Sequence, residues 1–228
     1  MKEYDSIPRV QDDGTLLGED VWAFNKLDGQ NFRAKYVAKG HDKKQFTVFG
    51  SRRQLVDENT EGFGEAVRYF RERYENVLKS IIANNSGKKG LFNGVDELLF
   101  VFEWYGENSF AGFHQEGDEL NLALTDVFMK KKGYIEPRDF YDIFCKDNRI
   151  ITPELIYHGK LTKEFINSIV NNDWTKDGCQ YPMVKEGVVC RRSSIMKGQR
   201  MPKCKFKTQW WLNKLHESFS EEECKLLE

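Results

Sequence analysis

The stretch Lys26-Leu27-Asp28-Gly29-Gln30-Asn31 is the most informative part of this sequence. Alternating apolar and aromatic residues lie on both sides of it, at 19–24 and 32–38, and this alternation predicts two β-strands. Asp-Gly between two such runs is typical of a tight turn, so we expect the strands to be joined there. The amine of Lys26 would then lie at the end of a strand. In isolation, the same pattern is also typical of a hairpin with a solvated lysine.

The composition is that of a folded protein. The 228 residues are 39% hydrophobic, and 35 Lys and Arg against 36 Asp and Glu give a net charge of -1. This balance excludes a uniformly basic nucleic-acid coat protein, although it allows a basic groove. Because no apolar run approaches the roughly 18 residues of a membrane span and the first residues lack an apolar signal segment, we expect no membrane partner. Five cysteines without a CxxC pair predict reduced thiols, and the four scattered histidines do not predict a zinc site.

Helical and strand patterns are mixed along the chain rather than alternating as βαβ units. Apolar runs predict further strands at 45–49, 98–102, 122–129, 188–190 and 203–207. Helical spacing predicts helices at 64–83, 137–145, 161–171 and 209–228. The sequence therefore predicts an α+β fold, with residues 1–228 forming a single domain.

Four later segments place charged side chains at the ends of predicted strands. Ser51-Arg52-Arg53 follows one strand, and Glu103 lies at the end of another. Glu186 precedes the buried run Gly187-Val188-Val189. Lys205 and Lys207 share one strand face because side chains two residues apart point the same way; Lys203 offers a rival register.

In this order, the five segments resemble motifs I, Ia, III, IV and V of the covalent nucleotidyltransferase superfamily, which contains DNA ligases, RNA ligases and mRNA capping enzymes. The resemblance covers residues 26–207. Asn31 stands where DNA ligases and capping enzymes usually carry Arg, and it resembles nick-sealing RNA ligases of the phage and RNA-editing type. Asp28 departs from that type, which often has His. The resemblance implies an ATP-grasp-like ligase adenylation domain with antiparallel sheets flanked by helices.

The resemblance also implies three nucleotidyl transfers that use ATP and Mg²⁺, with Mn²⁺ as the alternative metal, to join RNA ends bearing a 5′-phosphate and a 3′-hydroxyl. Lys26 is the implied nucleophile. A lysine has a pKa of about 10.4, so near pH 7.4 only about one in a thousand is uncharged. Lys205 and Lys207 would favour the neutral amine by like-charge repulsion and would neutralise the α-phosphate.

The remaining implied roles concern the metal and the nucleotide. Glu186 would bind the metal, and Glu103 would contact the ribose or orient the metal shell. Arg52, or Arg53 in a register shifted by one, would hold a phosphate by a fork of donors. Asn31 would bond to the nucleotide or to the 3′-hydroxyl strand.

Three further positions have two interpretations each. Asn25 precedes the nucleophile and could contact the edge of the base. Asp28 would touch the ligand or stabilise the turn. Leu122 falls where the family places a side chain against adenine, but related ligases have Phe or Tyr there, so a leucine favours core packing.

Only residues 208–228 follow Lys207, so we expect neither an OB-fold nor a substantial C-terminal domain. RNA would be gripped by the surface itself, by an accessory RNA-binding partner, or by a part outside this chain. Candidate contacts are Lys88-Lys89, Lys130-Lys131-Lys132 and Arg191-Arg192, although runs of this kind are more often solvated faces.

Two other functions fit parts of the pattern: a DNA ligase or GTP-dependent guanylyltransferase, and a non-catalytic nucleotide- or RNA-binding relative. By resemblance, the enzyme would act in the cytoplasm, including a host cytoplasm if it is encoded by a phage or virus.

Overall fold

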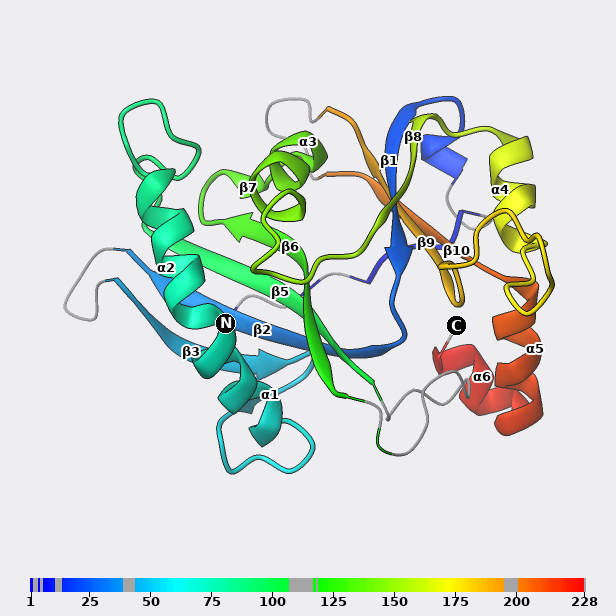
Figure 1. The fold of residues 1–228 in the computed structure, drawn as a ribbon, viewed down its shortest axis with the longest axis horizontal. Helices are drawn as coiled ribbons and strands as arrows, with labels where there is room; N and C mark the ends of the chain where they lie inside the picture. The colour runs from blue at the N-terminus through cyan, green and yellow to red at the C-terminus, as the bar shows by residue number, and fades with distance from the viewer. Residues whose placement is uncertain are drawn as a thin grey trace. The chain divides into compact units, whose positions relative to one another are not determined.

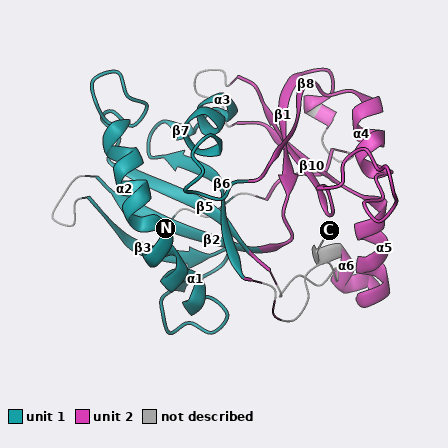
Figure 2. Ribbon diagram, viewed as in Figure 1, with its two compact units in different colours: residues 1–5, 30–104, 120–152 teal, residues 6–29, 105–119, 153–228 magenta. Residues whose placement is uncertain are grey.

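The computed structural model describes residues 1, 4, 6–10, 14–38, 44–106, 117, 119–194 and 201–227. The chain forms two compact units (Figure 2). Unit 1 comprises residues 1–5, 30–104 and 120–152, and unit 2 comprises residues 6–29, 105–119 and 153–228. Each unit is built on its own sheet, so the predicted α+β class is confirmed.

Unit 1 contains a six-stranded sheet in the order β4-β3-β2-β5-β6-β7 (Figure 1). Its strands are β2 (Gly29–Val37), β3 (Gln45–Ser51), β4 (Leu55–Val56), β5 (Glu97–Tyr105), β6 (Asn121–Met129) and β7 (Gly133–Tyr134). Its helices are α1 (Gly64–Tyr69), the π-helical η2 (Phe70–Tyr74), α2 (Glu75–Asn84), α3 (Pro137–Phe140) and the π-helical η3 (Tyr141–Cys145).

Aromatic packing joins the long helical segment to this sheet. The ring of Phe70 lies 5.4 Å from Phe49 of β3 and 5.6 Å from Phe102 of β5, between ring centroids. Phe32 of β2 completes the cluster at 6.2 Å from Phe70. Edge-on and tilted aromatic contacts of this kind add to the free energy gained by burial. Since successive strand residues point to opposite faces, Arg33 and Glu103 point away from the face that carries Phe32 and Phe102.

Unit 2 contains a four-stranded sheet in the order β10-β9-β1-β8. Its strands are β1 (Asp20–Lys26), β8 (Leu155–Lys160), β9 (Gly187–Arg192) and β10 (Lys203–Lys207). Its helices are η1 (Gly14–Leu16), α4 (Lys163–Val170), α5 (Gln209–Ser218) and α6 (Glu221–Leu227). Phe165 and Ile169 of α4 share a buried apolar cluster with residues of β1, β9 and β10, including Val188 and Phe206. The lysines at positions 205 and 207 alternate with this apolar set and lie on the opposite face.

Two expectations for local structure are wrong. β1 and β2 form, but they do not pair as a hairpin, because β1 has β9 on one side and β8 on the other. Asp28-Gly29 therefore passes the chain from one sheet to the other. The helix expected over 209–228 is divided into α5 and α6 at Phe219, whose backbone is extended with φ -134° and ψ 155°.

Strand β8 was not predicted from the sequence. Its residues are exposed or half-buried, so they form neither a continuous apolar run nor a clear alternation. None of the helices among the described residues is long and apolar enough to cross a membrane.

Candidate active site

Three motif residues meet at one end of the four-stranded sheet in unit 2. Lys26 ends β1 and Lys207 ends β10, and both are register partners of Gly187, the first residue of β9. The Lys26 Nζ atom lies 2.8 Å from each carboxylate oxygen of Glu186. The Lys207 Nζ atom lies 3.1 Å from Oε1 of the same carboxylate. The Glu186 carboxylate thus forms ion pairs with both amines.

Two of the three charged side chains in this cluster are buried, which makes their charges costly to desolvate. The side chains of Glu186 and Lys207 are 2% and 5% exposed, whereas that of Lys26 is 22% exposed. Burial lowers the pKa of Lys207 to about 8, aided by the positive charges of Lys26 and Lys205 and opposed by Glu186. With both amines charged, the cluster has an excess of positive charge, which favours an anion such as a phosphate.

Gly187 allows β9 and β10 to come close at this point. A Cβ atom on Gly187 would lie 2.2 Å from the carbonyl oxygen of Phe206 and 2.7 Å from the Cα atom of Lys207. A side chain here would push apart the strands that bring Glu186 and Lys207 together. Glycine after the glutamate is therefore required by packing.

Helix α5 begins directly after Lys207 and is bonded to the glutamate segment. Thr208 caps the helix by accepting a hydrogen bond from the Trp211 amide at 3.1 Å. The Thr208 hydroxyl donates to the Lys185 carbonyl at 2.7 Å, and its amide donates to the Glu186 carbonyl at 2.8 Å. The Trp211 indole Nε1 donates to Asp28 Oδ2 at 3.3 Å.

Asn25 is buried beside the nucleophile candidate, with 9% of its surface exposed. Its Nδ2 atom donates to the Met183 carbonyl at 2.9 Å, which fixes the orientation of the amide. Within the described part of the chain, its Oδ1 atom accepts no hydrogen bond. This atom is a buried acceptor available to a donor.

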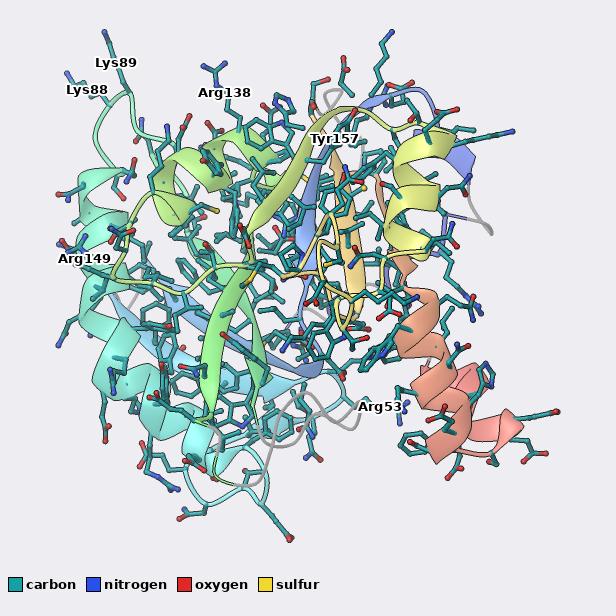
Figure 3. All side chains as sticks on the ribbon, turned by 45° about the vertical axis from the view of Figure 1, so that its right-hand side comes forward. Arg53, Lys88, Lys89, Arg138, Arg149 and Tyr157 are labelled. Carbon is teal, nitrogen blue, oxygen red and sulfur yellow. The ribbon has the colours of Figure 1, made fainter. Side chains whose placement is uncertain are left out.

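Unit 1 contains the other predicted site residues. Arg33, which is 3% exposed, donates from Nε to the Ser51 carbonyl at 3.0 Å and also from Nη2 to that carbonyl. This clamp holds the end of β3, after which Arg52 and Arg53 are both exposed (Figure 3 labels Arg53). Because both arginines are exposed, either of them can be the phosphate-binding residue that the motif predicts.

The other unit 1 candidates differ in burial. Glu103 is half-buried in β5. Asn31, in β2, has a buried Oδ1 atom that accepts no hydrogen bond from the residues described. Leu122 is fully buried in β6, as a core residue would be.

Comparison with known proteins identifies the family. The sequence model of the RNA ligase family matches residues 19–207. The chain belongs to the RNA ligase family. A comparison with curated proteins found no match.

Solved RNA ligase structures share the fold. The Naegleria gruberi RNA ligase with PPi is 16% identical, with a TM-score of 0.63 over 95% of this chain and 58% of that one. A mutant of the same ligase with AMP and Mn is 14% identical, with a TM-score of 0.63 over 94% and 58%. A mutant with ATP and Mn is 16% identical, with a TM-score of 0.63 over 96% and 58%. The chain thus spans about 58% of the length of these ligases, and the predicted ligase-type fold is confirmed.

In this RNA ligase family member, the residues predicted in unit 2 come together: Lys26, Asp28, Glu186 and Lys207 are linked through direct contacts or through Trp211. Lys205 is half-buried on the same strand face. Trp211 and Thr208 were not assigned a role from the sequence. The threonine-to-helix transition after Lys207 is the signal that could have indicated the cap.

The predicted basic segments differ in how their charges are balanced. Lys130 pairs with Glu97, Lys131 pairs with Asp96, and Lys132 donates to backbone carbonyls. Lys88 and Lys89 are exposed and project from the turn after α2 (Figure 3). The structure shows no disulfide bond at any of the five cysteines, all of which lie in described segments.

Proposed function

We propose that this protein is an ATP-dependent RNA ligase that joins 5′-phosphate and 3′-hydroxyl ends through a covalent lysyl-AMP. The family match over residues 19–207 supports an RNA substrate. The observation that carries the proposed chemistry is the buried Glu186 carboxylate, 2.8 Å from the Lys26 amine and 3.1 Å from the Lys207 amine.

In the first step, the Lys26 Nζ atom attacks the α-phosphorus of ATP. A phosphorus–nitrogen bond forms, and the bond between the α-phosphorus and the oxygen that bridges it to the β-phosphorus breaks. Pyrophosphate leaves with that electron pair, and the proton lost by the amine passes to solvent. Lys26 suits this role because it is the more exposed of the two lysines held by Glu186. Lys207, with Lys205 beside it, would neutralise the negative charge on the phosphate.

The donor set fits a divalent cation supplied together with a nucleotide. Among the described residues, no three His, Cys, Asp or Glu side chains are grouped so that they could hold a metal ion, so these residues form no all-protein metal cage. A cation such as Mg²⁺ needs only one or two carboxylates when phosphates and waters complete its shell. Glu186 would hold Mg²⁺ or Mn²⁺, and the bound cation would neutralise phosphate charge. The related Naegleria gruberi structures with Mn and ATP or AMP support this choice.

Asn25 supports ATP over GTP. Its buried Oδ1 acceptor suits the exocyclic amino group of adenine. Guanine has a carbonyl at that position, which would bring two acceptors together and leave both unsatisfied. Asn25 would thus read the edge of the base.

The later steps transfer AMP to the RNA 5′-phosphate and then seal the end with the 3′-hydroxyl. Arg52, or Arg53, would hold a phosphate, and Asn31 and Glu103 keep the nucleotide roles that the family resemblance implies. The full burial of Leu122 favours its interpretation as a core residue. An accessory RNA-binding partner, cytoplasmic action and a single adenylyltransferase domain over residues 1–228 stay predictions.

Covalent labelling tests the proposal. The protein is incubated with Mg²⁺ and with ATP or GTP carrying a radioactive α-phosphate, and is then separated on a denaturing gel. We expect an acid-labile, alkali-stable label from ATP that is absent from Lys26→Ala. Lys160→Ala, at the end of the neighbouring strand β8, is the matched control and should retain the label.

Sealing assays with nicked RNA and DNA duplexes then test the substrate. Labelling by GTP instead of ATP, or sealing of DNA alone, would contradict the proposed activity. If folded wild-type protein is labelled by neither nucleotide, the enzymatic proposal fails and a non-catalytic nucleotide- or RNA-binding role is left.

A further inference from the structure

Trp211 lies at the junction of three segments that contain motif residues. It is the third residue of α5 and is 2% exposed. Its indole Nε1 donates to Asp28, two residues after Lys26. The Lys207 ammonium lies 3.4 Å from the centroid of the same indole. One side chain therefore contacts both the aspartate of the first motif and the second lysine of the last.

Hydrogen bonds hold the backbone of Trp211 in place. The Trp211 amide donates to the Thr208 cap, and Thr208 is hydrogen-bonded to the carbonyls of Lys185 and Glu186. The backbone that carries Trp211 is thus fixed to the backbone that carries Glu186. Leu215 and Cys224 pack with Trp211 in a small buried cluster.

A lysine needs this kind of support. Its side chain is flexible, and ordering four rotatable bonds costs conformational entropy. Glu186 contacts the Lys207 amine, but the same carboxylate also forms an ion pair with Lys26. The aromatic face supplies a second, direct contact with a desolvated cation, which is the setting in which cation–π attraction is strongest.

We propose that Trp211 is a positioning residue for nucleotidyl transfer, holding the Lys207 ammonium with its ring face and Asp28 with its indole N–H. This inference rests on the proposed function for its effect on rate. Trp211 does not touch the reacting atoms; it acts through Lys207 and Asp28.

Trp210 provides a matched control in the same helix. Its ring packs edge-on against Trp174 at 5.3 Å, and it is half-buried. Replacing it removes a similar aromatic surface from α5 but not the ring beneath Lys207. General loosening of the helix would affect both tryptophan variants, whereas loss of positioning would affect only Trp211.

The experiment measures the maximal rate of lysyl-AMP formation and the ATP concentration that gives half that rate. For Trp211→Leu we expect the maximal rate to fall about 30-fold, equivalent to about 2 kcal/mol, the scale of a desolvated cation–π contact. The half-saturating ATP concentration should change little. Trp211→Phe keeps a ring face but loses the N–H, so we expect a smaller loss of about fivefold. Trp210→Leu should stay within about twofold of wild type.

A double-mutant cycle with Lys207→Ala gives the decisive readout. If Trp211 acts through Lys207, adding Trp211→Leu to Lys207→Ala should slow the reaction by only about threefold more. A full 30-fold multiplication, or an equal loss in Trp210→Leu, would overturn the proposal.

If the wild type forms no adduct, the proposed function fails, and the inference is decided by thermal unfolding instead. The same cycle should then show coupling between Trp211 and Lys207 and none between Trp210 and Lys207. Additive shifts in melting temperature for both pairs would refute the positioning contact.

Discussion

Replacing Glu186 by glutamine isolates the role of its charge. The substitution keeps the shape of the side chain and one acceptor oxygen, but removes the negative charge that faces two ammonium groups at 2.8 and 3.1 Å. The free protein would be left with the buried Lys207 ammonium and the half-buried Lys26 ammonium facing a neutral amide in place of a carboxylate. Glu186→Gln should therefore destabilise the fold before any substrate is considered.

The magnitude follows from burial and from the pKa of Lys207. Breaking a buried ion pair by removing one partner costs about 3–5 kcal/mol. We expect the lower end, about 3 kcal/mol, because Lys26 is 22% exposed and Lys207, with a pKa of about 8, can release its proton. For a chain of this size, 1 kcal/mol shifts the melting temperature by about 2–4 °C, so we expect a decrease of roughly 6–12 °C.

Glu75→Gln is a matched control because Glu75 also contacts two cations, Arg71 at 3.2 Å and Lys79 at 2.6 Å. Those cations are 43% and 34% exposed, so the control should lose less than about 1 kcal/mol. Melting temperatures are measured at pH 7 in a chelator, so that metal ions do not contribute. Adding Lys207→Met to Glu186→Gln should recover part of the loss. Equal melting temperatures for Glu186→Gln and Glu75→Gln would refute the reasoning.

Two further predictions concern the same end of the sheet. The pKa of Lys207 is lowered from its ordinary value of 10.5 to about 8, so between these pH values the unfolded chain binds a proton that the folded chain does not. Stability should rise with pH there by up to about 3 kcal/mol relative to Lys207→Met, and parallel pH curves from chemical unfolding would contradict this. Gly187→Ala should destabilise the fold by at least about 2 kcal/mol and abolish adenylylation, because its Cβ would lie 2.2 Å from the Phe206 carbonyl oxygen; a folded, active variant would show that β9 and β10 can separate without loss.

Strands with clear alternation or long apolar runs were predictable from the sequence. The alternation in 203–207 correctly separates buried Cys204 and Phe206 from the lysines on the other face. Strand partners were not predictable in the same way. Asp-Gly favours a hairpin locally, but the residues of β1 pair with residues 131–140 positions later in β8 and 161–171 positions later in β9, and local sequence does not identify these partners.

The candidate site shows the same limit at the level of single residues. The sequence places Lys205 and Lys207 on one face, but it does not show which of them reaches Glu186. Strand register decides this, because Lys205 pairs with Val189 and Lys207 with Gly187, the residue next to the glutamate. The hydrogen bond from the Trp211 indole to Asp28 was also not predictable, because it joins residues that are far apart in the sequence.

The unequal exposure of the two lysines supports a division of labour between them. A nucleophile must reach a phosphorus atom on a substrate, and Lys26, at 22% exposed, retains that access. Lys207, at 5% exposed, is enclosed by Glu186 and Trp211 and so has little freedom to move toward a substrate. Fixed charge is most effective when it does not have to reorganise during the reaction. The buried Lys207 is thus suited to stabilise developing charge, and the more accessible Lys26 to attack.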